Sequence, residues 1–148
     1  MTTPKVADPL ADFAPFGEMP PPVRVFIPVV PPSSLSTNAR RRGNWREQSR
    51  DTADVLADCL MTLKVVAIDP VPGPVSLDIL VCWPTGRRRP DVDALGSLTK
   101  HHLDALVQTG VLPAGDGPDA VVRVAYRQTK VKDPDAAGVV FTITKEQP

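Results

Sequence analysis

The stretch that decides the fold is residues 75–84, which read Val-Ser-Leu-Asp-Ile-Leu-Val-Cys-Trp-Pro. Large aliphatic residues occupy every second position of its first seven, namely Val75, Leu77, Ile79 and Val81. Because successive side chains of a strand point to opposite faces, this alternation predicts a β-strand with one strongly apolar face. Prolines and a glycine precede the stretch, and we expect the strand to end at Trp83-Pro84.

Other segments follow the same rules. Short β-rich runs predict further strands at residues 23–27, 120–127 and 139–144. Apolar residues spaced by three and four predict a first helix over about residues 45–66, with its face at Ala53, Leu56, Leu60 and Leu63. A second helix is predicted over about residues 97–109, with Leu98, Leu103, Leu106 and Val107 as apolar positions and Gly110 as its C-terminal cap. The predicted order is β-α-β-α-β-β.

Length and composition limit the protein's class. The 148 residues suggest one domain, residues 23–148, after a proline-rich tail at residues 1–22 that we expect to be disordered. The formal net charge is zero, so only local clusters of arginine can favour a polyanionic partner. Cys59 and Cys82 lack metal-ligand spacing and are interpreted as buried free thiols. With no secretory signal or membrane-spanning run, we expect a cytoplasmic protein.

The residues that carry chemistry follow the predicted strand of residues 75–84. Asp91 and Asp93 come after three consecutive arginines, Arg87, Arg88 and Arg89. Carboxylates are ligands for hard cations such as Mg²⁺, and guanidinium groups match phosphate oxygens. Together they indicate metal-assisted hydrolysis of a phosphodiester, provided that a turn brings the two carboxylates together. A solvated Asp-x-Asp turn is the alternative interpretation.

Further downstream, Lys100 is a candidate for stabilising charge on the reacting phosphate. Its alternative is a surface ion pair with Asp104, four residues later on the same helix. His101 and His102 have no histidine partner at helical spacing, and we expect surface or boundary positions for both.

In the order and spacing of its motifs, the chain resembles the RusA-like Holliday junction resolvases, a family of endodeoxyribonucleases common in phages. The similarity covers roughly residues 23–145. It rests on an early Pro-Pro-Ser with Asn38 at residues 31–38, on Asp-Val-Asp at 91–93, and on Lys100 followed by Asp-Ala-Leu at 104–106. Gly-Val-Leu-Pro at 110–113, followed by Asp116 and Asp119, completes the pattern.

This resemblance implies an α+β fold, with a small mixed sheet of about four strands, two helices packed on it and a homodimer. It also implies Mg²⁺-dependent nicking of four-way DNA junctions in recombination and repair, with Mn²⁺ as a possible substitute. Asp91 and Asp93 would be metal ligands and Lys100 the catalytic lysine. The family usually has two adjacent acids where this chain has Ala114-Gly115, so the third metal ligand and catalytic acid would be Asp116, or otherwise Asp119.

Contacts with the DNA backbone are expected from one asparagine and two groups of arginines, Asn38, Arg40, Arg41, Arg42, Arg46, Arg87, Arg88 and Arg89. Two alternatives to the resolvase remain. One is a catalytically degenerate protein of the same fold that binds branched DNA without cutting it. The other is an Asp-x-Asp phosphohydrolase acting on a small molecule, which the lack of a glycine-rich phosphate loop and the short chain disfavour.

Overall fold

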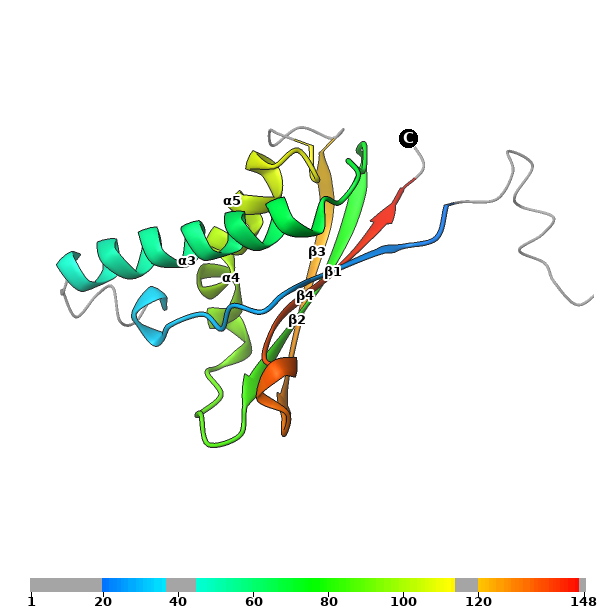
Figure 1. The fold of residues 1–148 in the computed structure, drawn as a ribbon. Helices are drawn as coiled ribbons and strands as arrows, with labels where there is room; N and C mark the ends of the chain where they lie inside the picture. The colour runs from blue at the N-terminus through cyan, green and yellow to red at the C-terminus, as the bar shows by residue number, and fades with distance from the viewer. Residues whose placement is uncertain (1–19, 37–44, 114–119, 147–148) are drawn as a thin grey trace, which may run out of the picture.

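The computed structural model describes residues 20–36, 45–113 and 120–146. These residues form one mixed β-sheet with its helices on one side (Figure 1). In chain order the elements are β1 (Val23–Ile27), η2 (Ser33–Leu35), α3 (Trp45–Val66), β2 (Val75–Pro84), η3 (Val92–Ala94), α4 (Leu95–Leu98), α5 (Lys100–Gln108), β3 (Val121–Val131), η4 (Pro134–Ala136) and β4 (Gly138–Lys145). The α+β class and the predicted order of strands and longer helices are confirmed.

The sheet has the strand order β1-β4-β2-β3. β4 pairs antiparallel with both β1 and β2, whereas β2 and β3 run parallel. A parallel pair requires a crossover, and here the segment between β2 and β3 contains η3, α4 and α5. The candidate site residues Asp91, Asp93 and Lys100 therefore all lie in this one connection.

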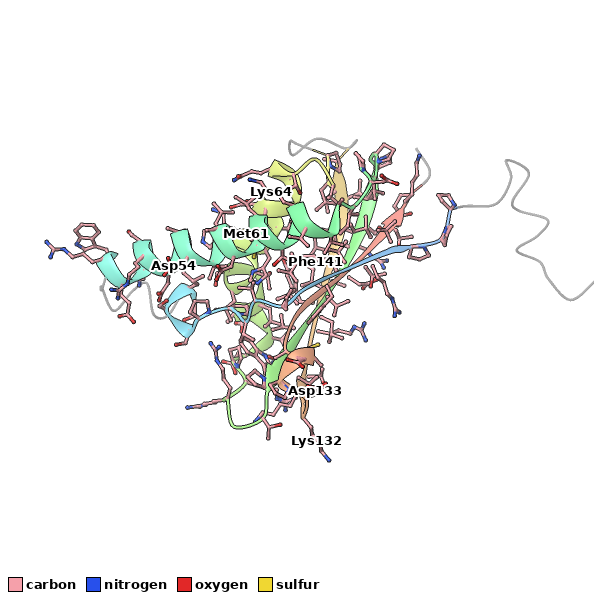
Figure 2. All side chains as sticks on the ribbon, viewed as in Figure 1. Asp54, Met61, Lys64, Lys132, Asp133 and Phe141 are labelled. Carbon is pink, nitrogen blue, oxygen red and sulfur yellow. The ribbon has the colours of Figure 1, made fainter. Side chains whose placement is uncertain are left out.

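β2 is a central strand whose predicted apolar face is buried, although Ser76 and Cys82 on its other face are buried as well. Val75, Leu77, Ile79 and Val81 are all buried, together with Trp83, on the side that packs under the helices. On the opposite side Asp78 and Leu80 are half-buried. The strand ends at Pro84, as predicted. Phe141 of the neighbouring β4, labelled in Figure 2, is buried in the same core.

The first helix has the predicted bounds, but the predicted face is partly wrong. The buried residues of α3 are Val55, Cys59 and Leu63, whereas Ala53 is exposed. Leu56 and Leu60 are only half-buried and flank the core. Two adjacent apolar rows run along this helix, and the row that is buried packs chiefly against α5. Figure 2 shows Asp54, Met61 and Lys64 along the helix, and all three are exposed.

Cys59 and Cys82 are buried free thiols, as predicted. Burial, together with the smaller effect of the nearby charge of Asp58, raises the pKa of Cys59 to about 12. The thiol of Cys59 therefore stays protonated at neutral pH, which fits a packing role and not a reactive one.

The second predicted helix is interrupted at Thr99, which separates α4 from α5. The Thr99 hydroxyl donates to the carbonyl oxygen of Leu95 at 2.8 Å, and the Thr99 backbone (φ −99°, ψ 3°) leaves the helical region. Local hydroxyl bonds of this kind compete with the regular helix ladder. Beyond α5, Gly110 has φ +81° and its N–H donates to Val107, so it is the predicted cap.

One strand is longer than predicted. β3 extends to Val131, four residues beyond the predicted end, because it pairs with β2 as far as Pro84. Of the predicted N-terminal tail, residues 1–19 lie outside the described residues, and residues 20–22 are exposed and irregular. No helix in the described ranges is long and apolar enough to cross a membrane.

Candidate functional site

The loop that leaves β2 carries the acidic and basic residues singled out by sequence. It begins with a tight turn in which the Arg87 N–H donates to the Pro84 carbonyl oxygen at 3.1 Å. Gly86 in this turn has φ +94°, a conformation that glycine adopts readily. The Thr85 N–H donates to the Val131 carbonyl oxygen at 3.2 Å, so the start of the loop is bonded to the end of β3.

Arg87 makes contacts within the chain. Its guanidinium group lies over the indole ring of Trp83, 4.9 Å from the centroid, and its Nη2 donates to the Pro31 carbonyl oxygen at 2.5 Å. Arg87 is half-buried, and burial lowers its pKa. By contrast, Arg88 and Arg89 are exposed. Of the three arginines, Arg88 and Arg89 are therefore the better candidates for phosphate contacts.

Asp91 and Asp93 lie at the short turn η3, not on a continuous extended segment. Asp91 precedes the turn with φ −65° and ψ 149°, and its carbonyl oxygen accepts from the Ala94 N–H at 3.0 Å. Its side chain makes no capping hydrogen bond, and both aspartates are exposed. Asp91 is thus extended, whereas Asp93 lies within the 3-10 turn, so the two aspartates are not alternate residues of one regular strand.

The neighbouring strand β3 contributes a residue that the sequence did not single out. Gln128 donates from Nε2 to the carbonyl oxygen of Pro90 at 2.8 Å, directly before Asp91. Its Oε1 accepts from the Trp83 indole N–H at 3.0 Å. These contacts join positions 38 and 45 residues apart, so no local sequence pattern reveals them. The sequence signal for Gln128 is that a polar residue stands on the same face of β3 as Tyr126.

Lys100 is exposed and begins α5, immediately after the break at Thr99. The alternative ion pair with Asp104 is not found among the described residues. Asp104 instead lies 3.7 Å from Nδ1 of His101, three residues before it. The Lys100 ammonium group is therefore exposed at the first residue of the helix, one short turn and one short helix after Asp91.

The expectation that His101 and His102 lie at the surface or boundary is wrong, because both are buried. His102 Nε2 donates to the carbonyl oxygen of Val29 at 2.7 Å, which fixes its neutral tautomer. Burial lowers the pKa of His102 to about 4; the Val29 bond opposes this shift and the charge of His101 adds to it. Within the described part of the chain, Nδ1 of His102 has no hydrogen-bond partner. His102 is thus a neutral core residue that joins α5 to the segment after β1.

The other predicted DNA-binding residues lie near the start of α3. Arg46 is exposed, and its guanidinium group lies 5.5 Å from the ring centroid of Trp45, which is also exposed. In Figure 1 this end of α3 extends beyond the sheet. The remaining candidates, Asn38, Arg40, Arg41 and Arg42, lie outside the described residues.

The predicted metal ligands come from two segments of the chain. Asp116 and Asp119, the candidates for a third ligand, lie outside the described residues. Within the described ranges, no group of three or more His, Cys, Asp or Glu side chains could hold a metal ion. Mg²⁺ commonly binds through one or two carboxylates together with waters and substrate phosphates. Asp91 and Asp93 are two exposed carboxylates of the kind that bind such an ion.

No protein-family model matches the chain, and no curated protein matches it.

Proposed function

We propose that the protein is a Mg²⁺-dependent, structure-specific DNA endonuclease that resolves four-way junctions by paired nicks, as the RusA-like resolvases do. Mn²⁺ would substitute for Mg²⁺. The proposal includes a homodimer, because two active sites related by a two-fold axis can address two opposed strands. It also places the protein in DNA recombination and repair in the cytoplasm.

The observation that carries the proposal is the state of the Asp91 and Asp93 carboxylates. Both are exposed, and the Asp91 side chain makes no capping hydrogen bond to the turn that follows it. Two exposed cations, Arg88 and Arg89, precede them in the same loop. This combination of oxygen donors beside guanidinium groups suits a metal ion and a phosphate held together.

Each residue has a separate role in the proposed reaction. Asp91 and Asp93 would hold the cation, with Asp116 as the proposed third ligand. The cation, when bound, would activate water and offset the charge that develops on the phosphate. The exposed ammonium group of Lys100 would stabilise the same negative charge in the transition state. Binding of Asp91 through its carboxylate is compatible with its backbone role, because only its carbonyl oxygen bonds to the turn.

Affinity for DNA would come from exposed guanidinium groups. Arg88, Arg89 and Arg46 meet this condition, and Asn38 and Arg40–Arg42 remain proposed contacts. Such contacts to backbone phosphates release counterions, so binding should weaken as the salt concentration rises. They carry little base information, which fits recognition of junction shape instead of sequence.

The test is cleavage of a synthetic four-way junction. The purified protein is incubated with labelled junction or with linear duplex of the same sequence, in Mg²⁺, Mn²⁺ or EDTA. The proposal predicts paired nicks in the junction with either metal, few in the duplex and none in EDTA. Binding of the junction without a metal-dependent nick would instead support the degenerate DNA-binding alternative. Equal cleavage of duplex and junction would contradict structure specificity.

A further inference from the structure

A buried indole lies behind the loop that carries the two aspartates. Trp83 is 1% exposed, and its N–H is a donor that needs an acceptor once it is buried. It finds one in Oε1 of Gln128, at 3.0 Å. Because the indole N–H can only donate, the oxygen of the Gln128 amide must face Trp83 and its nitrogen must face away.

The nitrogen of the same amide reaches the loop. Nε2 of Gln128 donates to the carbonyl oxygen of Pro90 at 2.8 Å. A carbonyl oxygen can only accept, so the contacts at both ends of the amide require the same orientation. Gln128 therefore bridges a core residue of β2 and the backbone of the loop through two hydrogen bonds of unambiguous direction.

The Pro90 carbonyl group belongs to the peptide unit that leads into Asp91. That unit is planar, so a bond to its oxygen also orients the amide nitrogen and Cα of Asp91. The proline ring restricts the backbone on the preceding side. On the following side, the Asp91 carbonyl oxygen accepts from the Ala94 N–H at 3.0 Å. Asp91 is thus held on both sides, while its carboxylate remains exposed.

The helix-facing side of β3 extends this support. Gln128 pairs with Val81 in the parallel register, and Tyr126, two residues earlier, faces the same side. The Tyr126 hydroxyl lies 3.6 Å from where a Cβ on Gly96 would be, so its side chain packs against the start of α4. Two alternate residues of one strand therefore contact the backbone on either side of η3.

We propose that Gln128 is a positioning residue that holds the Asp91 carboxylate in place for the divalent cation. The inference rests on the proposed function, since it assigns a role in that same site. A free loop would have to lose backbone freedom each time the cation binds, whereas the Gln128 bonds remove that freedom beforehand. Loss of Gln128 should weaken cation binding without altering the ligands themselves.

The test measures cation binding directly with Tb³⁺, whose luminescence is sensitised by tryptophan. The chain has two tryptophans, and Trp45→Phe leaves Trp83, behind the loop, as the only sensitiser when the excitation wavelength is one that tryptophan absorbs and tyrosine does not. In this background Gln128→Met keeps the side-chain length and removes both hydrogen bonds. The apparent affinity for Tb³⁺ should fall about tenfold, the lower end of the range for residues that orient metal ligands. Gln108→Met, at an exposed position of α5, is the matched control and should leave the Tb³⁺ affinity unchanged.

A second readout separates positioning from mere support of the fold. In junction cleavage, Gln128→Met should raise the Mg²⁺ concentration for half-maximal rate about tenfold, and excess Mg²⁺ should largely restore the rate. Trp83→Phe keeps the hydrogen bond from Gln128 Nε2 to Pro90, so it should raise this Mg²⁺ concentration less. A Gln128→Met variant with reduced thermal stability but an unchanged Mg²⁺ requirement and Tb³⁺ affinity would overturn the inference.

Failure of the proposed function would look different. If Asp91→Asn left the Tb³⁺ affinity of the Trp45→Phe background unchanged, Asp91 would not be a ligand, and both proposals would fall. If Asp91→Asn abolished binding while Gln128→Met did not weaken it, only the role of Gln128 would be overturned.

Discussion

The guanidinium group of Arg87 lies over the indole ring of Trp83, 4.9 Å from its centroid, and ties the loop after β2 to the core. The same group donates to the Pro31 carbonyl oxygen. The contact therefore connects three parts of the chain: the end of β2, the loop with the candidate acids, and the segment that follows β1. An arginine that sequence alone assigns to DNA has a structural role here.

Arg87→Ala should lower the free energy of unfolding by about 1–3 kcal/mol, because it removes a cation–π contact and a charge-assisted hydrogen bond. Arg87→Lys should recover part of this loss, since an ammonium group keeps the charge but not the planar fork. Urea denaturation measures both. Arg88→Ala, at an exposed position of the same loop, is the control and should change stability by less than about 0.5 kcal/mol. Equal losses for Arg87→Ala and Arg88→Ala would refute the structural role.

Lys100→Met should reduce the rate of junction cleavage at saturating Mg²⁺ by about 100-fold, because it removes a cation that acts on transition-state charge. Junction affinity should change little. Lys64→Met, on the exposed side of α3, is the matched control and should cleave normally. A Lys100→Met variant that loses affinity but retains its rate at saturating junction would show a binding residue and not a catalytic one.

His102 makes stability depend on pH in a defined direction. Its pKa is lowered from 6.5 to about 4 in the folded protein, so the unfolded chain binds the proton more readily. The stability that neutral His102 contributes to the folded protein is fully present above pH 6.5 and is lost as the pH falls toward 4. The loss should reach about 3 kcal/mol. Urea denaturation at pH 7 and pH 4.5 measures it, and His102→Gln should show a smaller difference between the two pH values. An unchanged difference would assign the acid sensitivity to other groups.

Gly138 has φ +152°, and a Cβ there would collide with the carbonyl oxygen of Ile27 and with Pro28. Gly138→Ala should therefore destabilise the protein by more than about 3 kcal/mol, since backbone atoms must move. At Gly110 (φ +81°) a Cβ would meet open space, so Gly110→Ala should cost only about 1 kcal/mol. Thermal or urea unfolding compares the two. Similar losses would show that backbone conformation, not the close approach of β1, sets the cost at Gly138.

Much of the fold follows from local pattern. The alternation in residues 75–84 predicts β2, and the spacing of apolar residues predicts the bounds of α3. The face of α3 is harder to predict, because residues 55, 56, 59, 60 and 63 form a broad apolar surface, and packing against α5 decides which part of it is buried. The break at Thr99 and the burial of His102 depend on a hydroxyl bond and on the Val29 carbonyl group, which no periodicity indicates.

Local sequence pattern likewise predicts some residues of the candidate site and misses others. Asp91, Asp93 and Lys100 can be found from residue type and spacing. Gln128 cannot, because its role depends on the parallel pairing of β2 with β3 and on contacts across long separations. Arg87 has contacts that its charge does not indicate, since its neighbours in space include Trp83 and Pro31.

The measurement that tests the central claim most directly is the rate of Mg²⁺-dependent nicking of a four-way junction by Asp91→Asn, compared with Asp54→Asn. Both changes remove one exposed carboxylate charge, but Asp54 lies on α3 and not in the loop (Figure 2). We predict that Asp91→Asn lowers the rate by at least about 100-fold, equivalent to about 2.7 kcal/mol of lost transition-state stabilisation. Asp54→Asn should cleave at the wild-type rate. Equal rates for the two variants would contradict a metal site at Asp91.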